Sequence, residues 1–306
     1  MNILDRISDA VSSIHNYGEI RFESNKNLTM SLHNGKSERV NWVHLTGGSV
    51  RILTPEHGWG FAVFNRLDDI QEAVEHAIAS STAVHPDENI KIAEVEPVQD
   101  EIRLELANDD ARDVPIQRKY ELLKEYDELG KDADQRIIER IVSYTQEFHT
   151  GYLLTTEGTR IIRNRGDCVI RVIFRAKDGN SVQSAHKSFA TRGSFSELTR
   201  KQKEVKEVAT ISARLLDAKS VKGGIYTTVL DPALAGVFIH EAFGHLSEAD
   251  HIENNPQARN MMKLGKRFGP EFLNVFDDGS VMPEIRGTIT YDDEGVPAGK
   301  TYLIRE

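Results

Sequence analysis

Residues 167–191 read DCVIRVIFRAKDGNSVQSAHKSFAT, which is the pattern of a strand, a turn and a second strand. The first arm, residues 167–176, is rich in the β-branched and aromatic side chains that strands favour. The Asp178-Gly179-Asn180 segment is a hairpin signal, because such residues tolerate the backbone angles of a tight turn. This part of the chain therefore predicts antiparallel β structure.

Similar runs lie on both sides of this hairpin. Further strands are predicted at residues 19–24, 28–33, 49–53, 60–64, 136–146, 152–156 and 160–164, with turns at Asn-Gly, Gly-Gly and Glu157-Gly158 steps. Helical spacing of apolar residues predicts helices at 3–14, 68–79, 120–129 and 197–216. The order of helix, antiparallel strands and helix thus occurs twice. We predict an α+β protein with two similar helix/antiparallel-sheet units, followed by a strand–helix segment.

The expected domain boundaries follow from this order and from composition. Residues between Pro86 and Pro115 are polar and acidic with only weak alternation, which is typical of an extended connection. We therefore expect an N-terminal α+β unit at 1–85, an acidic extended linker at 86–117, a second α+β unit at 118–222, and a further domain from residue 223 to 306.

Composition restricts the class of protein. The formal net charge is −10 and the pI is about 5.6, which argues against a nucleic-acid-binding surface. No apolar run approaches the ~20 residues of a membrane span, and the N-terminus lacks a signal-peptide core. A single cysteine, Cys168, excludes an internal disulfide framework and is expected to be a small buried hydrophobe. These features favour a cytoplasmic protein with no membrane and no nucleic-acid partner.

The motif with the clearest chemistry is GVFIHEAFGH at residues 236–245. It places His240, Glu241 and His245 in one short segment on the pattern H-E-x-x-x-H. Two neutral imidazoles can hold a zinc ion, and a neighbouring carboxylate can take a proton from its water. The motif therefore indicates Zn2+-dependent hydrolysis, with His240 and His245 as metal ligands and Glu241 as the catalytic base.

The five-residue spacing of the histidines requires a distorted helix. On ideal geometry they lie about 140° apart around the axis, too far apart to bind one ion. A one-residue π-bulge would bring them onto one face, and Gly244 has no Cβ to resist it. The apolar run 237–239 before His240 predicts a buried helix, and Asp231-Pro232 is a natural N-terminal cap for it, after a strand expected at 226–230.

Three separate blocks of the sequence resemble the TldD/PmbA family of metallopeptidases. They are Val229-Leu230-Asp231-Pro232, then His240 to His245 with Glu248 and Asp250, and then Asp292-Asp293-Glu294-Gly295-Val296-Pro297. The resemblance covers essentially the whole chain. It implies a zinc-dependent cytoplasmic peptidase that cleaves peptides or flexible protein segments and forms a homodimer or a heterodimer with a related subunit.

The resemblance also implies a third zinc ligand, a cysteine near the C-terminus of family members. The chain ends at Glu306, before that region, so residues 223–306 are expected to be the start of an incomplete, C-terminally truncated metallopeptidase domain. Cys168 lies upstream and cannot inherit the role. Nearby candidates are Glu248, Asp250, His251 and Glu253, which are favoured instead as a solvated helix end or as groups that orient the imidazoles.

Two alternatives remain open. The segment from His240 to His245 also fits H-E-x-x-G-H, the motif of dipeptidyl-peptidase III, although the E-E-x-x-A-D/E block of that family does not follow it. The other alternative is a non-catalytic or incomplete subunit that needs further sequence or a partner chain to bind metal. It predicts an exposed apolar surface where the missing elements belong.

Overall fold

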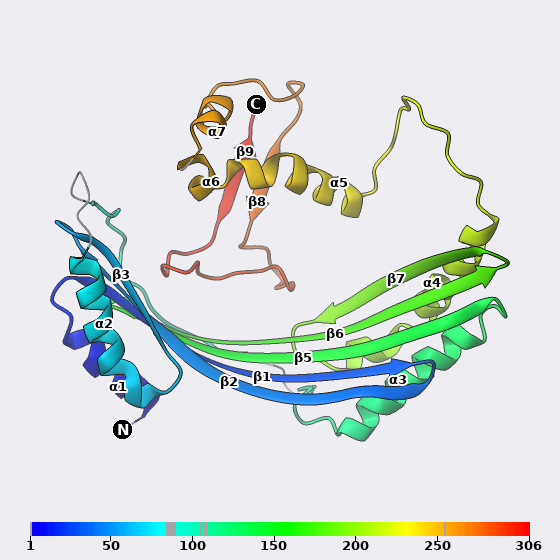
Figure 1. Cartoon of the computed structure of the whole chain (residues 1–306), viewed down its shortest axis with the longest axis horizontal. Coiled ribbons are helices and arrows are strands. Elements are labelled where there is room, and N and C mark those ends of the chain that lie inside the picture. Colours follow the sequence, from blue (N-terminus) through cyan, green and yellow to red (C-terminus); the bar gives the residue numbers. More distant parts are fainter. Residues whose placement is uncertain (1, 84–89, 105, 107–108, 254) are drawn as a thin grey trace. The chain divides into compact units, whose positions relative to one another are not determined.

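A computed structural model describes residues 2–83, 90–104, 106, 109–253 and 255–306 (Figure 1). It contains two compact units: unit 1 is Met1–Ala218 with Asp293–Val296, and unit 2 is Lys219–Asp292 with Pro297–Glu306. Part of the predicted acidic linker, residues 86–89, 105 and 107–108, lies outside the described residues. The predicted α+β class is confirmed, because helices and a mainly antiparallel sheet make up unit 1.

Unit 1 is built on one seven-stranded sheet. Its strands are β1 (Tyr17–His33), β2 (Lys36–Thr54), β3 (Gly58–Phe64), β4 (Gln99–Ile102), β5 (Ile137–Thr155), β6 (Arg160–Asp178) and β7 (Ser181–Thr191). The order is β3-β2-β1-β5-β6-β4, and β7 also pairs with β6. All pairs are antiparallel except β4 with β6. Since β1 pairs with β5, the strands of the two predicted units belong to one sheet. The predicted domain boundaries stay a prediction.

The predicted strands are shorter than those observed. Residues 19–24 and 28–33 belong to one strand, β1, and β5 and β6 likewise each join two predicted runs. The expected Gly-Gly turn is wrong, because Gly47 and Gly48 lie inside β2. A Cβ on Gly48 would lie 2.3 Å from the Phe64 ring and from the Arg21 carbonyl oxygen. Glycine is therefore needed there for close packing between strands, not for a change of chain direction.

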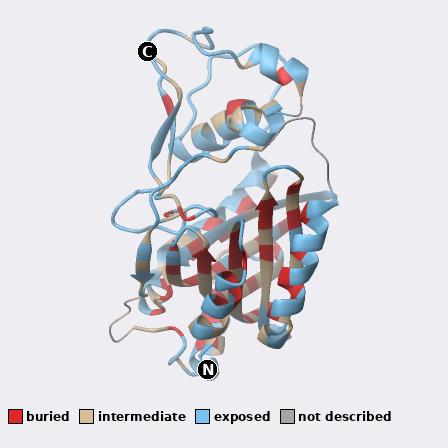
Figure 2. Ribbon diagram, turned by 90° about the vertical axis from the view of Figure 1, so that its left-hand side faces the viewer, coloured by how far each residue is buried: buried red, intermediate tan, exposed pale blue. Residues whose placement is uncertain are grey.

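Four helices cover one face of this sheet in two groups. One core contains α1 (Ile3–Ser12) and α2 (Ile70–Thr82), and the other contains α3 (Ile116–Lys131) and α4 (Gln202–Arg214). The even-numbered residues of β1 serve both cores: Ile20 and Phe22 in the first, Leu28, Met30 and Leu32 in the second. Figure 2 shows that buried residues line the strands and the inner sides of the helices. The odd-numbered residues of β1 point to the opposite, helix-free face.

Unit 2 has short elements and little buried surface. They are α5 (Pro232–Ile239), α6 (Ala249–Glu253), α7 (Pro256–Met261) and a hairpin of β8 (Val275–Asp278) and β9 (Lys300–Ile304). The strand predicted at 226–230 is wrong: these residues have no strand partner within the described chain, and Val229 is 98% exposed. None of the described helices has the length and apolar character that crossing a membrane requires.

Candidate metal centre

The histidine motif lies at the end of α5, where the helix changes its pitch. The carboxylate of Asp231 accepts a hydrogen bond from the backbone N–H of Leu234 at 2.7 Å, and Pro232 occupies the first turn. This is the cap that the sequence predicts, and it sets where the helix begins. Eight residues later α5 passes directly into a π turn, His240–Gly244, and then a short 3-10 turn, His245–Ser247.

The π turn is the distortion that the five-residue spacing requires. The backbone N–H of His245 donates to the carbonyl of His240, a hydrogen bond across five residues. A Cβ on Gly244 would lie 3.3 Å from Nδ1 of His240, which is tighter than ordinary van der Waals contact. Glycine therefore lets the His240 ring lie over the turn. The π turn and the role of Gly244 were both predicted from the sequence.

As a result the two imidazoles and the carboxylate of Glu241 come together. The ring centroids of His240 and His245 lie 4.3 Å apart, with the planes at 60°. One ligand atom from each of His240, Glu241 and His245 can be chosen so that all three lie within 4.8 Å of one another. Nitrogen ligands of a tetrahedral zinc lie roughly 3.3 Å apart, so two imidazoles this close are compatible with binding one ion.

A second carboxylate orients one of the imidazoles. Oε1 of Glu248 lies 2.8 Å from Nδ1 of His245. When Nδ1–H donates to Glu248, the lone pair is on Nε2, and Nε2 lies 3.9 Å from Oε2 of Glu241. A carboxylate on the far nitrogen is typical of metal-binding histidines, since it fixes the tautomer and the ring. Of the two roles considered for Glu248, the geometry supports orientation of the imidazole.

The helix that carries the motif is more exposed than predicted. None of the residues of α5 is buried, and Val237 and Phe238 are 56% and 59% exposed. The expectation of a buried helix is therefore wrong for the described chain. Only Phe243 of the π turn is buried, in edge-to-face contact with Phe268 at 4.9 Å between centroids. This contact fixes the turn within unit 2, while the opposite side of α5 has no apolar cover among the described residues.

The remaining candidate ligands lie outside this group. Among the described residues, His240, Glu241 and His245 form the one set of three donors with suitable spacing. Asp250, His251 and Glu253 are exposed and lie on α6, outside the set. Cys168 is fully buried in the core of unit 1, and burial raises the pKa of its thiol to about 11. The prediction that it is a buried hydrophobe is confirmed.

Comparison with protein families gives one consistent match along the chain. Three models match: PmbA/TldA metallopeptidase domain 1 at residues 18–81, the central domain at 109–219, and the C-terminal domain at 223–306. They occur in chain order, and the last contains the whole histidine motif. The family of dipeptidyl-peptidase III is therefore not supported.

Similar proteins agree with this match. A metalloprotease of Synechocystis is 36% identical over 287 residues, covering 94% of this chain and 61% of the relative. A zinc metalloprotease TldD homolog of Saccharolobus solfataricus is 24% identical over 264 residues, covering 84% and 56%. The solved structure of TldE from Thermococcus kodakarensis has the same fold, with a TM-score of 0.68, 18% identity, and 99% and 67% of the two chains covered. The chain spans about three fifths of the length of the Synechocystis relative.

Proposed function

We propose that this chain, which belongs to the PmbA/TldD metallopeptidase family, catalyses zinc-dependent hydrolysis of peptide bonds. The observation that carries the proposal is the π turn, which brings His240, Glu241 and His245 into one cluster. The printed name of the Saccharolobus relative supports zinc as the ion. The chemistry of the donors supports it too, since imidazole nitrogens suit zinc well.

In this proposal His240 and His245 would hold the ion, and Glu248 would keep the His245 ring in the orientation that leaves Nε2 free. When bound, zinc supplies a Lewis acid that lowers the pKa of water and polarises a carbonyl group. Two imidazoles are fewer than the three protein ligands of ordinary catalytic zinc sites. We therefore infer that a third ligand, in addition to His240 and His245, completes the site.

Glu241 would act as the general base. Its side chain is 66% exposed and points to the same side as Nε2 of His245, so water and a substrate can reach it. The carboxylate would take a proton from the attacking water and then pass it to the leaving amine as the peptide bond breaks. One residue can perform both transfers, because the carboxylate returns to its ionised form at the end.

Substrate, assembly and compartment are also proposals. Peptides or flexible protein segments are supported by the metalloprotease names of the relatives. A homodimer, or a heterodimer with a related subunit, would supply the surface that covers the exposed side of α5. We also propose a cytoplasmic site of action and no nucleic-acid partner, and the net charge of −10 supports the second point.

A second candidate function is a non-catalytic or incomplete subunit of a TldD/PmbA-type assembly. It is favoured by the exposure of Val237 and Phe238 beside the motif. In that case His240 and His245 bind metal strongly only after the remaining ligand is supplied.

The test is the substitution Glu241→Gln, which keeps the shape of the side chain and removes its basicity. We expect loss of zinc-dependent cleavage of an unstructured casein substrate, with zinc content unchanged. The matched control is Glu253→Gln, an exposed glutamate outside the cluster. Equal turnover in wild type and Glu241→Gln would refute the catalytic role. Absence of activity in wild type with zinc bound would favour the incomplete subunit.

A further inference from the structure

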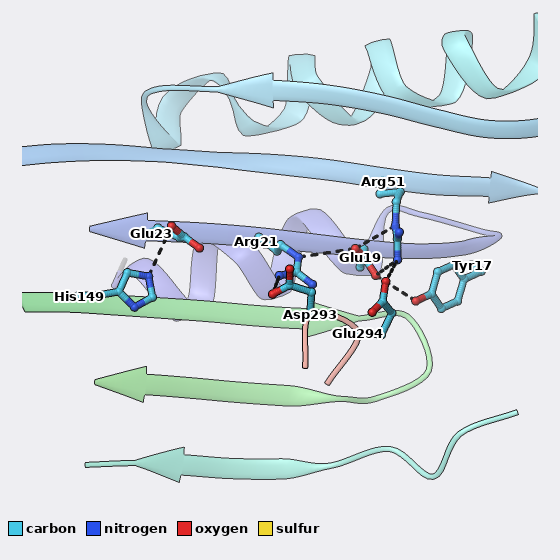
Figure 3. Close-up of polar contacts among 8 residues, drawn as sticks. All are labelled: Tyr17, Glu19, Arg21, Glu23, Arg51, His149, Asp293 and Glu294. Carbon is cyan, nitrogen blue, oxygen red and sulfur yellow. Dashed lines mark hydrogen bonds and ion pairs between the residues drawn. The ribbon is translucent and has the colours of Figure 1, made fainter. Parts of the chain in front are cut away.

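The segment Asp293–Val296 lies on the helix-free face of the unit 1 sheet, 272 residues along the chain from its partner Arg21. The residues on either side of it, Asp292 and Pro297, belong to unit 2. We call Asp293–Val296 the strap. Figure 3 shows its two acidic side chains reaching the odd-numbered face of β1 and the end of β2. This contact does not involve the histidine motif, so its function is a separate question.

Arg51 joins the strap to a buried carboxylate. Its Nη2 donates to Oε2 of Glu19 and to Oε1 of Glu294, at 3.0 Å each (Figure 3). The Glu19 side chain is only 4% exposed and also accepts from the Tyr17 hydroxyl at 3.1 Å. The Arg51 guanidinium lies 4.8 Å from the centroid of the Trp59 ring, which limits its rotation. Arg51 is thus fixed in place by the sheet, and one of its N–H groups is aimed at the strap.

Arg21 makes the second contact. Its Nη1 donates to Oδ1 of Asp293 at 3.1 Å, and its Nε lies 3.7 Å from Oε1 of Glu19. Asp293 itself is 85% exposed, so this single pair contributes little in water. Glu19 therefore lies between the two arginines and holds them side by side. In this arrangement Arg21 contacts Asp293 and Arg51 contacts the next residue, Glu294.

The charges on this part of the sheet explain why an acidic segment binds there. Burial lowers the pKa of Arg163, and the nearby carboxylate of Asp293 counteracts this effect. Arg21, Arg51 and Arg163 together carry two positive charges more than Glu19 neutralises. Glu23 lowers this excess, since it interacts with Arg21 and Arg163 as well as with His149 at 3.4 Å. The strap brings its two carboxylates to the positive charge that remains.

The glycine of the strap provides a second, steric determinant. Gly295 is buried and has a φ of +84°, a conformation that other residues rarely adopt. A Cβ there would lie 3.0 to 3.2 Å from the side chains of Thr159, Ile161 and Leu153. The backbone of the strap thus lies directly on an apolar part of the sheet. The strap therefore combines two carboxylates with a following residue that has no side chain.

We propose that Arg21 and Arg51, held by Glu19, form a binding site for an acidic Asp-Glu-Gly segment, which the chain fills with its own strap. The site is an ionic latch that keeps the strap on the sheet of unit 1. The predicted ligand of this site is an acidic peptide segment. The strength of binding depends on charge as well as on steric fit. The latch does not depend on the peptidase proposal.

The test uses the 306-residue chain and hydrogen–deuterium exchange of the amides of residues 294–296. The double substitution Asp293→Asn/Glu294→Gln removes both charges, keeps the shapes and leaves the sheet untouched. We expect exchange about tenfold faster than in wild type, because two ion pairs no longer oppose local opening. In wild type, 1 M NaCl should also speed exchange, and this salt effect should vanish in the variant.

Two matched controls define the outcome. Asp277→Asn removes an exposed acid of β8, and Arg171→Ala removes an exposed arginine of β6 on the same sheet face as Arg21. Both should exchange like wild type, whereas Arg21→Ala should exchange faster. Exchange within about twofold of wild type in the double variant would overturn the latch. Faster exchange in Gly295→Ala, combined with unchanged exchange in the double variant, would show that steric fit without charge holds the strap.

Discussion

Oε1 of Glu248 lies 2.8 Å from Nδ1 of His245, so the ring that faces Glu241 is held from behind by a carboxylate. The two residues are three positions apart, across the 3-10 turn that follows the π turn. The change of helical pitch therefore does two things. It brings His240 beside His245, and it places Glu248 where it can orient the second imidazole.

The first prediction concerns Glu248. Substitution by Gln should weaken zinc binding by roughly tenfold or more, because groups that orient metal-bound histidines typically contribute that much. Competition with a chromophoric chelator measures the zinc dissociation constant directly. Asp250→Asn is the control, since Asp250 is not in the cluster. Identical zinc affinities for Glu248→Gln and the control would contradict the orienting role.

Gly244 provides a second prediction. A methyl group there would lie 3.3 Å from Nδ1 of His240, so Gly244→Ala should displace the ring and lower zinc affinity by about tenfold. Gly236→Ala is the matched control on α5, where an added Cβ meets nothing within 4 Å. The control should bind zinc normally and stabilise the helix by up to about 1 kcal/mol. Normal zinc binding by Gly244→Ala would show that the turn tolerates a Cβ.

Lys119 provides a third prediction, on stability. Its side chain is 2% exposed, Nζ donates to Oε1 of Gln146 at 2.8 Å, and burial lowers its pKa below 10.5. Lys119→Met should raise the free energy of unfolding at pH 7 by about 1 kcal/mol, because a buried charge is removed. Gln146 still accepts from the Tyr144 hydroxyl at 2.9 Å.

The pH dependence of this gain has a definite sign. Between the lowered folded pKa and 10.5, the unfolded chain binds the additional proton, so the stability of wild type rises with pH. The advantage of Lys119→Met should therefore be larger at pH 7 than at pH 9.5. Urea unfolding of both proteins at the two pH values measures it. An advantage that grows with pH would contradict a buried, partly neutralised lysine.

Cys168 provides a fourth prediction. Burial raises the pKa of its thiol to about 11 from an ordinary value of 9.0, and Sγ lies 3.4 Å from the Tyr144 hydroxyl. At pH 8 the thiolate is about 100-fold rarer than in the unfolded chain, and reagents have no access. The reaction with a thiol-specific disulfide reagent should thus be at least that much slower than in urea. Rapid labelling of the native protein would show that the core around Cys168 opens.

Local features of the fold were predictable from the sequence, and pairings between distant segments were not. The turns at Asn34-Gly35, Glu157-Gly158 and Asp178-Gly179 follow from residue type and are present. Neither segment alone shows that β1 pairs with β5, because every strand has two edges at which another strand can pair. The predicted strand at 226–230 failed for the opposite reason: its residues suit a strand, but no described strand lies beside it.

In the candidate metal centre, too, local features were predictable from the sequence and contacts with distant residues were not. The spacing of His240 and His245 predicted a π turn, since two histidines five residues apart reach one face of a helix only through such a distortion. The exposure of Val237 and Phe238 was not predictable, because burial depends on what packs against a helix. The contacts of Asp293 and Glu294 with arginines more than 240 residues away were missed entirely. The signal for them was the combination of adjacent acids with a glycine.

Zinc titration of the 306-residue chain, followed by elemental analysis, tests the central claim most directly. We predict about one zinc per chain at saturation in wild type and none above background in His240→Ala/His245→Ala. The matched control is His15→Ala/His186→Ala, which removes two exposed histidines of unit 1 and should bind like wild type. Equal zinc binding by the His240→Ala/His245→Ala variant and wild type would contradict the assignment of the metal centre.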